Sequence, residues 1–183
     1  DVFMAILKIQ HPILDDFKIT YGFFTRSGGT SKKPFDTLNC SFNNEDSSNN
    51  VKENLELVRK ELNLDKIIQL NQIHSKEVIT LNNKDKNYNL KDADGLVTNL
   101  KGIGLSILGA DCAPILFYDN VLKVIGACHA GWRGAINNII GTTITKMESL
   151  GSKRNNITAI IGPTIHKKSY EIKEDVAAIV TNS

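Results

Sequence analysis

Residues 121–150 read VLKVIGACHAGWRGAINNIIGTTITKMESL, and they decide the fold class of this 183-residue chain. The apolar run from Val121 to Cys128 is typical of a strand. The segment from Ala135 to Leu150 has the apolar spacing of a helix that Gly151 ends. Because Ile157–Ile161 predicts another strand, the three segments form a βαβ unit, right-handed by the general rule.

The turn between this strand and helix is His129-Ala130-Gly131-Trp132-Arg133-Gly134. It places His129 at the carboxyl end of a strand, facing a helix amino terminus, where α/β proteins tend to bind anions and do chemistry. Arg133 stands at the expected helix start, where a positive charge opposes the helix dipole. We therefore expect Arg133 either to pair with Asp94 or Asp111, or to clamp a phosphate or carboxylate.

Upstream, the pattern predicts hairpin strands and an amphipathic helix. Apolar residues recur with helical spacing from Val51 to Leu62, so one face of that helix is buried. The predicted strands are Ile19–Phe24, Ile67–Leu70, Glu77–Leu81, Ile103–Leu108 and Ile115–Tyr118. Asp119-Asn120 is predicted to form a two-residue hairpin turn, and Asp175–Val180 is predicted to form a last helix. The sequence thus predicts an α/β fold with a mixed sheet and helices outside, in one domain over residues 1–183.

The charge balance argues against some classes of partner. The chain has 22 basic and 20 acidic residues and a formal net charge of +2, which gives no reason to expect nucleic acid or a membrane surface. No apolar run reaches the ~18 residues needed to span a bilayer. Residues 1–8 lack the basic region and cleavage site of a signal peptide. We expect a cytoplasmic protein.

Three soft or borderline metal ligands, His74, Cys112 and His129, stand at predicted turns. An odd number of cysteines without framework spacing favours reduced thiols, and Cys40 and Cys128 are expected to be buried and inert. Cys112 and His129 flank the inferred hairpin, so they return to the same end of the sheet. Two histidines and one cysteine with an open fourth position form a catalytic zinc set, which lowers the pKa of bound water toward ~7.

These residues also have structural interpretations. By spacing alone, Cys112 is more typical of a small buried hydrophobic residue. His74 is also compatible with a surface histidine, as we expect for His11 and His166. Without a local ligand pair such as CxxC or HExxH, spacing alone is weak evidence for a metal. Asp111, next to Cys112, either orients a ligating histidine through a hydrogen bond or caps a turn.

Two further turns carry charged residues. Thr25-Arg26-Ser27-Gly28-Gly29 follows a predicted strand, and it can place backbone amides toward a ligand. Arg26 in this turn is a second candidate for contact with an anion. Asp92 and Asp94 fit a turn, with Asp94 directly before Gly95.

Seven motifs of the chain occur in the order of one family. They are Phe23–Gly29, Asn71–His74, Asp92–Gly95, Gly109–Pro114, His129–Gly134, Gly162–Ile165 and Tyr170–Ile172. The chain resembles the YfiH-type family, long labelled laccase-domain or polyphenol oxidase and now regarded as purine nucleoside phosphorylases. The resemblance runs from about Tyr21 to Ile172, nearly the whole chain.

The resemblance implies a single α/β domain with a sandwich-like core. It also implies a zinc ion held by His74, Cys112 and His129, although such ligands accept copper too. The implied reaction is cleavage of adenosine, inosine, guanosine or methylthioadenosine by phosphate to free base and ribose 1-phosphate, with adenosine deamination in some members. The implied partners are therefore a purine nucleoside and phosphate, and we expect a monomer or weak homodimer.

The remaining predicted site residues are as follows. Arg26 and Arg133 become candidates for phosphate contact, where they would stabilise charge in the transition state. Asp111 joins the predicted catalytic residues, and Asn71 and Asp94 the predicted substrate- or phosphate-binding residues. Asn71 stands where many members carry a lysine, which weakens or moves any phosphate contact there.

The chain departs from the family at its carboxyl end. The family usually continues well beyond the equivalent of Tyr170–Ile172, so we expect a shortened carboxyl-terminal part. Three alternatives to phosphorolysis stay open: copper-dependent oxidation of phenols, nucleophilic catalysis by Cys112 with His129 as base, and a non-catalytic metal-binding remnant.

Overall fold

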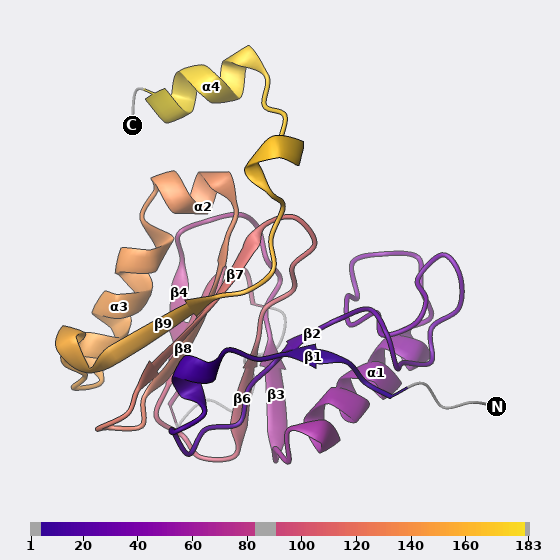
Figure 1. Ribbon diagram of the computed structural model, residues 1–183, viewed down its shortest axis with the longest axis horizontal. Coiled ribbons are helices and arrows are strands. Elements are labelled where there is room, and N and C mark those ends of the chain that lie inside the picture. Colours follow the sequence, from indigo (N-terminus) through magenta and orange to yellow (C-terminus); the bar gives the residue numbers. More distant parts are fainter. Residues whose placement is uncertain (1–4, 83–90, 182–183) are drawn as a thin grey trace. The chain divides into compact units, whose positions relative to one another are not determined.

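The computed structural model describes residues 5–82 and 91–181 and has the mixed α/β fold that the sequence predicts (Figure 1). The chain divides into two compact units, residues 1–67 with 102–104 and residues 68–101 with 105–183. The expectation of one domain over residues 1–183 stays a prediction.

The first unit is built on a short antiparallel pair and one helix. The pair is β1 (Lys8–Ile9) with β2 (Phe23–Phe24), and the 3-10 helix η1 (Pro12–Leu14) lies between them in the chain. The predicted strand Ile19–Phe24 is thus reduced to its last two residues. The reason is local, because Tyr21 directs its hydroxyl to the backbone of His11 and fixes this stretch without a strand ladder.

Helix α1 (Ser48–Glu61) confirms the predicted amphipathic helix. It begins three positions earlier than Val51 because the Ser47 hydroxyl accepts a hydrogen bond from the Asn49 amide and so caps the helix. Its inner face buries Val51 and Asn54. The Asn54 amide bonds to the loop over residues 30–39, so this helix holds that loop in place.

The second unit contains a five-stranded sheet with the order β4-β5-β8-β7-β9. Its strands are β4 (Val78–Thr80), β5 (Gly95–Thr98), β7 (Ala113–Asp119), β8 (Ile125–Ala130) and β9 (Ile157–Ile161). β4 and β5 are parallel, and the other neighbours are antiparallel. A separate two-stranded sheet consists of β3 (Lys66–Gln69) and β6 (Ile103–Ser106).

The predicted βαβ unit exists in a split form. β8 and β9 both run antiparallel to β7, so they are parallel to each other, but β7 lies between them. The crossover therefore passes over one intervening strand, which periodicity along the chain does not reveal.

The single helix predicted over Ala135–Leu150 is wrong, because the structure has two helices there. α2 (Trp132–Ile136) begins directly after Gly131, and α3 (Ile139–Ser149) follows it. Between them Asn138 adopts a left-handed conformation, with φ 65° and ψ 40°, and its side chain caps α3 at the Gly141 amide. Asparagine tolerates this conformation better than most residues, so the break is built into the sequence.

Helix α3 packs on the sheet and forms the core of the second unit with it (Figure 1). Ile139 and Met147 of α3 are fully buried in this core. The helix approaches closely because Gly126 on β8 has no side chain: a Cβ there would lie 3.0 Å from the Met147 sulfur.

The turn before β8 is longer than predicted. The two-residue hairpin at Asp119-Asn120 is wrong, since β8 begins at Ile125 and not at Val121. The Asp119 carboxylate accepts hydrogen bonds from the amides of Val121 and Leu122, and Lys123 has φ 61°. These side chain–backbone bonds replace strand pairing in this segment.

The carboxyl-terminal segment holds the short helices η2 (Arg154–Asn156) and η3 (Lys167–Ser169), followed by α4 (Glu174–Thr181), which confirms the predicted last helix. Among the described residues, none of the helices is long and apolar enough to cross a lipid bilayer.

Candidate metal centre

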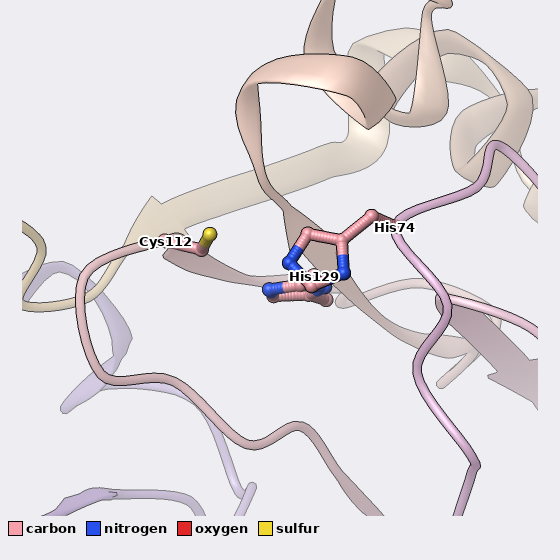
Figure 2. A group of neighbouring side chains, drawn as sticks. All are labelled: His74, Cys112 and His129. Atoms are coloured by element: carbon pink, nitrogen blue, oxygen red, sulfur yellow. The ribbon is translucent and has the colours of Figure 1, made fainter. Parts of the chain in front are cut away.

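Three donor side chains from distant parts of the chain meet at one end of the five-stranded sheet (Figure 2). They are His74, Cys112 and His129, and their ligand atoms all lie within 4.8 Å of one another. Their exposure increases outward: His129 is buried, Cys112 is half-buried and His74 is exposed. The structure therefore brings together the three residues that the sequence proposed as ligands.

Strand pairing explains how Cys112 and His129 meet. β7 and β8 pair so that Pro114 lies opposite His129 and Ala113 opposite Ala130. Cys112 directly precedes β7, so the hairpin returns His129 to the same end of the sheet. The prediction from hairpin geometry holds although the turn is longer than expected, because both ends of the hairpin remain in register.

The loop that carries His74 is held by one buried carboxylate. Asp94 has no exposed surface, and it accepts hydrogen bonds from the amides of Ile73, His74 and Ser75 and from the Ser75 hydroxyl. Three consecutive amides can converge on one carboxylate because His74 has φ 60°, in the left-handed region. That conformation is unfavourable for histidine, so the contacts to Asp94 maintain it.

The same carboxylate orients His129. Nδ1 of His129 lies 2.8 Å from Oδ1 of Asp94. Burial raises the pKa of the Asp94 carboxyl, but hydrogen bonds from His129 and Ser75 outweigh burial and hold that pKa below its ordinary value. An ionised carboxylate can only accept, so Nδ1 of His129 carries the proton and Nε2 is left with its lone pair for a ligand.

Gly131 leaves room for all three donors. A Cβ at this position would lie 3.0 Å from Cδ2 of His74, 3.1 Å from Sγ of Cys112 and 3.8 Å from Cε1 of His129. The φ of Gly131 is −69°, which any residue adopts. Glycine is therefore required here for space and not for backbone conformation.

The Cys112 thiol is placed where it needs a cation to ionise. Burial raises its pKa above the ordinary value, and the negative charges of Asp111 and Asp94 raise it further. A metal ion would reverse this balance because it stabilises the thiolate directly. Burial also raises the pKa of the other two cysteines, to about 12 for Cys128 and about 11 for Cys40. Cys128 is fully buried as predicted, whereas Cys40 is only half-buried, so the expectation of a buried Cys40 is wrong.

The donor set fits a zinc ion. Zinc bonds of about 2.0 Å to nitrogen and 2.3 Å to sulfur place tetrahedral ligands roughly 3.5 Å apart, and the observed donors are within 4.8 Å of one another. The rings of His74 and His129 meet edge to face, with centroids 4.8 Å apart. His74 is the exposed member of the set, so binding of zinc would require its ring to move toward the other two donors.

The other predicted site residues of the second unit have these positions. Asp111 is exposed, and its backbone carbonyl accepts hydrogen bonds from the Thr164 hydroxyl and the Ile165 amide. The carboxylate that is hydrogen-bonded to the candidate ligand His129 belongs to Asp94, not to Asp111. Arg133 is exposed and lies over the Trp132 ring, 5.0 Å from its centroid. In the ranges 5–82 and 91–181, Arg133 makes no ion pair, so its expected pairing with Asp94 or Asp111 is wrong.

Two predicted phosphate contacts are engaged with protein groups. Asn71 donates from Nδ2 to the Asp92 carboxylate at 2.7 Å. Arg26, in the first unit, donates from Nε to the Asp36 carbonyl, and its guanidinium lies 3.4 Å from the Asp36 carboxylate. Asp94 was expected to contact substrate or phosphate, but its oxygens accept the five protein hydrogen bonds described above. The substrate contacts of all three residues stay predictions.

The glycine turn in the first unit does not present amides to a ligand. The amides of Gly28 and Gly29 both donate to the Thr37 hydroxyl, at 3.0 and 3.1 Å. The next amide, of Thr30, donates to the buried Asn54 side chain. The expectation of a backbone anion site is therefore wrong, because partners more than seven positions away take up these donors.

Two residues that make long-range hydrogen bonds beside the donors escaped sequence reasoning. Ser75 joins the His74 loop to Asp94, and Gln72 bonds to the backbone of Leu108 in the segment that leads to Cys112. Both lie within three positions of His74. The only signal in the sequence was that Ser75 and Gln72 stand close to the candidate ligand His74. Their hydrogen-bond partners are distant in the chain, and the pairing of the strands determines which they are.

Comparisons with known proteins identify the family to which this chain is similar. Residues 20–183 match the family described as multi-copper polyphenol oxidoreductase laccase. The purine nucleoside phosphorylase YlmD of Bacillus subtilis is 34% identical over 170 residues, covering 87% of this chain and 61% of the relative. A purine nucleoside phosphorylase of Corynebacterium glutamicum is 37% identical over 158 residues, covering 85% and 64%.

A solved structure matches as well. The crystal structure of the Bacillus licheniformis hypothetical protein YfiH superposes with a TM-score of 0.79 at 30% identity, covering 88% of this chain and 64% of that one. The chain thus spans a little under two thirds of the length of each of these three proteins.

Proposed function

Because the chain belongs to the multi-copper polyphenol oxidoreductase laccase family, which confirms the YfiH-type resemblance, we propose that it is a zinc-dependent purine nucleoside phosphorylase. The observation that carries the proposal is the cluster of His74, Cys112 and His129, with Asp94 buried behind it. The names of the matched relatives support the reaction class. The proposed substrates are adenosine, inosine, guanosine or methylthioadenosine together with phosphate, and adenosine deamination is the proposed side activity.

His74, Cys112 and His129 would hold the zinc ion through two imidazole nitrogens and one thiolate. When bound, zinc supplies a Lewis acid and an open position at which the pKa of water falls toward ~7. Asp94 keeps the proton of His129 on Nδ1, which leaves Nε2 directed to the site. Copper is the alternative metal, since two imidazoles and a thiolate suit it too.

Phosphorolysis requires that an oxygen of phosphate attacks C1′ of the ribose while the bond from C1′ to the purine nitrogen breaks. The bonding electrons leave with the base, whose nitrogen takes up the proton that the phosphate loses, and the products are free base and ribose 1-phosphate. We assign the phosphate contact to Arg133, an exposed cation two positions after Gly131. Four other residues stay proposed contributors to catalysis or to substrate and phosphate binding, namely Arg26, Asn71, Asp94 and Asp111. In the structure, the contacts of these four residues are to other protein groups.

A direct assay tests the proposal. The chain is loaded with zinc and mixed with adenosine and phosphate, and adenine and ribose 1-phosphate are measured. Turnover should be lost in H129A, whereas H166A should keep it, since His166 is exposed and its Nδ1 caps the Lys168 amide. Wild-type turnover no higher than that of H129A would contradict the proposal.

A thiol-labelling experiment separates metal ligation from nucleophilic catalysis by Cys112. A zinc-bound thiolate resists alkylation until a chelator removes the metal. Cys128 serves as the internal control, because its burial and raised pKa keep it unreactive in the folded protein. Alkylation of Cys112 at the same rate with and without chelator would favour the nucleophile.

The two remaining alternatives predict different results. Phenol oxidation by several coppers needs many histidines, whereas the chain has four, of which His11 and His166 each use Nδ1 to accept a backbone amide. Oxygen uptake on a phenol after copper loading would support it. A non-catalytic remnant would bind metal but would not be stabilised by nucleoside. A protein that binds the nucleoside should gain about 2.7 kcal/mol in free energy of unfolding at a ligand concentration of ~100 times the dissociation constant.

A further inference from the structure

The side-chain amide of Gln72 is paired with the backbone of Leu108. Nε2 of Gln72 donates to the Leu108 carbonyl at 2.8 Å, and the Leu108 amide donates to Oε1 of Gln72 at 2.7 Å. Both halves of one carboxamide are thus matched to both polar groups of one backbone residue. The same two-bond pattern joins two residues that lie directly opposite each other on adjacent antiparallel strands.

The pairing joins two loops that carry different donors. Gln72 precedes His74 by two positions, and Leu108 precedes Cys112 by four. Neither loop is in a strand at these positions, because β3 ends at Gln69 and β6 ends at Ser106. The two bonds therefore act where the regular strands have ended.

Other contacts hold each loop from a different side. Asp94 ties the His74 loop to His129. On the Cys112 side, the Asp111 carbonyl accepts from the Thr164 hydroxyl and the Ile165 amide. These contacts fix the His74 loop to Asp94 and the Cys112 loop to the segment that carries Thr164 and Ile165. The bonds of Gln72 run from one loop to the other, so they act on the distance between His74 and Cys112.

We propose that Gln72 is a positioning residue that holds the Cys112 thiol within binding distance of the two imidazoles. Metal–donor distances in bound sites fall within about 0.2 Å of their ideal values, so a loop that is free to move must be ordered on binding and binds metal more weakly. The inference rests on the metal site of the proposed function, and it does not depend on the substrate.

The test uses the variant Gln72→Met, which keeps the length of the side chain and removes both hydrogen bonds. Cobalt(II) is the probe, because its thiolate charge-transfer absorption reports the Cys112 bond separately from the imidazole bonds. We expect Q72M to bind cobalt about 10–100-fold more weakly than wild type and to show a weaker thiolate band at saturation. The control is Ile73→Ala in the same loop, since the Ile73 side chain is exposed.

A double-mutant cycle with Cys112→Ser sharpens the test. If Gln72 acts through the Cys112 loop, Q72M should weaken cobalt binding much less in the C112S background than in wild type. Thermal melts of the metal-free proteins establish that each variant folds. A Q72M protein that is folded and matches wild type in cobalt affinity and thiolate band overturns the inference and leaves the metal site standing. Failure of wild type to bind cobalt overturns both.

Discussion

His129 and Asp94 are joined by two hydrogen bonds although 35 positions separate them in the chain. The His129 amide donates to the Asp94 carbonyl at 2.8 Å, and the imidazole Nδ1 lies 2.8 Å from the Asp94 carboxylate. The register of β5 with β8 causes this, because Gly95 lies opposite Cys128 and the next pair outward is Asp94 with His129. A sheet register thus sets the tautomer of a candidate metal ligand.

Asp94→Asn should weaken both the fold and the metal site. One oxygen becomes a donor, so the His74 amide loses an acceptor and the His129 ring is driven toward the tautomer protonated on Nε2. A buried donor without a partner costs about 1–3 kcal/mol, and loss of the orienting carboxylate weakens metal binding about 10–100-fold. Urea unfolding of the metal-free protein and competition with a chelator measure the two effects.

The matched control for this variant is Glu77→Gln, which makes the same charge change at an exposed carboxylate. It should leave both quantities close to wild type. Equal metal affinities for D94N and E77Q would show that Asp94 does not position His129.

Gly131→Ala should reduce metal affinity more than stability. The added methyl group would lie 3.0 Å from the His74 ring and 3.1 Å from the Cys112 sulfur, so the donors have to move apart. The backbone conformation suits alanine, so we expect a change of only about 1 kcal/mol in the free energy of unfolding. Gly22→Ala is the control, because the three atoms nearest to its Cβ all belong to the Lys8 side chain and none to a candidate metal ligand. Unchanged zinc affinity in G131A would argue against crowding at this position.

Asn138 should matter through both its backbone and its side chain. Asn138→Gly keeps the left-handed conformation and loses the cap on Gly141, which costs a few tenths of a kcal/mol. Asn138→Ala loses the cap and also places a Cβ in the left-handed region, for a total of about 2 kcal/mol. Chemical denaturation should rank stability as wild type, N138G, N138A. The reverse order of the two variants would exclude a left-handed break between α2 and α3.

Stability should depend on pH through Asp119. Burial raises the pKa of its carboxyl, but hydrogen bonds, including those from the amides of Val121 and Leu122, outweigh burial and lower that pKa below its ordinary value. A depressed folded-state pKa means that the ionised carboxylate stabilises the protein above the unfolded pKa of about 3.9. This contribution is lost as pH falls through the folded-state pKa.

Asp119→Asn tests this pH dependence, since the amide oxygen can still accept but the group no longer titrates. At pH 7 the variant should be less stable by about 1 kcal/mol, and the gap should narrow below about pH 4. Urea unfolding of both proteins from pH 7 to acid measures the gap. A constant gap over that range would mean that Asp119 does not titrate with folding.

Arg133→Gln tests the proposed phosphate contact. Loss of a hydrogen bond to a charged group costs about 1.5–3 kcal/mol, so the KM for phosphate should rise at least tenfold while zinc content stays unchanged. Kinetics at varied phosphate and fixed adenosine provide the measurement. Arg154→Gln is the control, because Arg154 is exposed and pairs with Glu148. Equal effects of the two variants would indicate a general loss of positive charge.

Local patterns were enough to predict much of this molecule. The alternation and spacing of apolar residues predicted α1, β9 and α4 and the strands on either side of His74, because burial of one face leaves a period in the sequence. The three donors were also predicted, since histidine and cysteine at strand ends suggest metal chemistry whatever surrounds them. The sequence analysis did not predict the break at Asn138 or the long turn after Asp119. Each of these features arises because one side chain bonds to nearby backbone amides.

Tertiary structure alone decided how the donors are held. The sequence offered Asp111 as the residue that orients a histidine, since it adjoins Cys112, but strand register brings Asp94 to His129 instead. Register depends on pairing between distant strands, which leaves no period along the chain. The sequence by itself therefore determined which side chains are candidate metal donors, and the sheet determined which carboxylate and which amide bond to the segments that carry them.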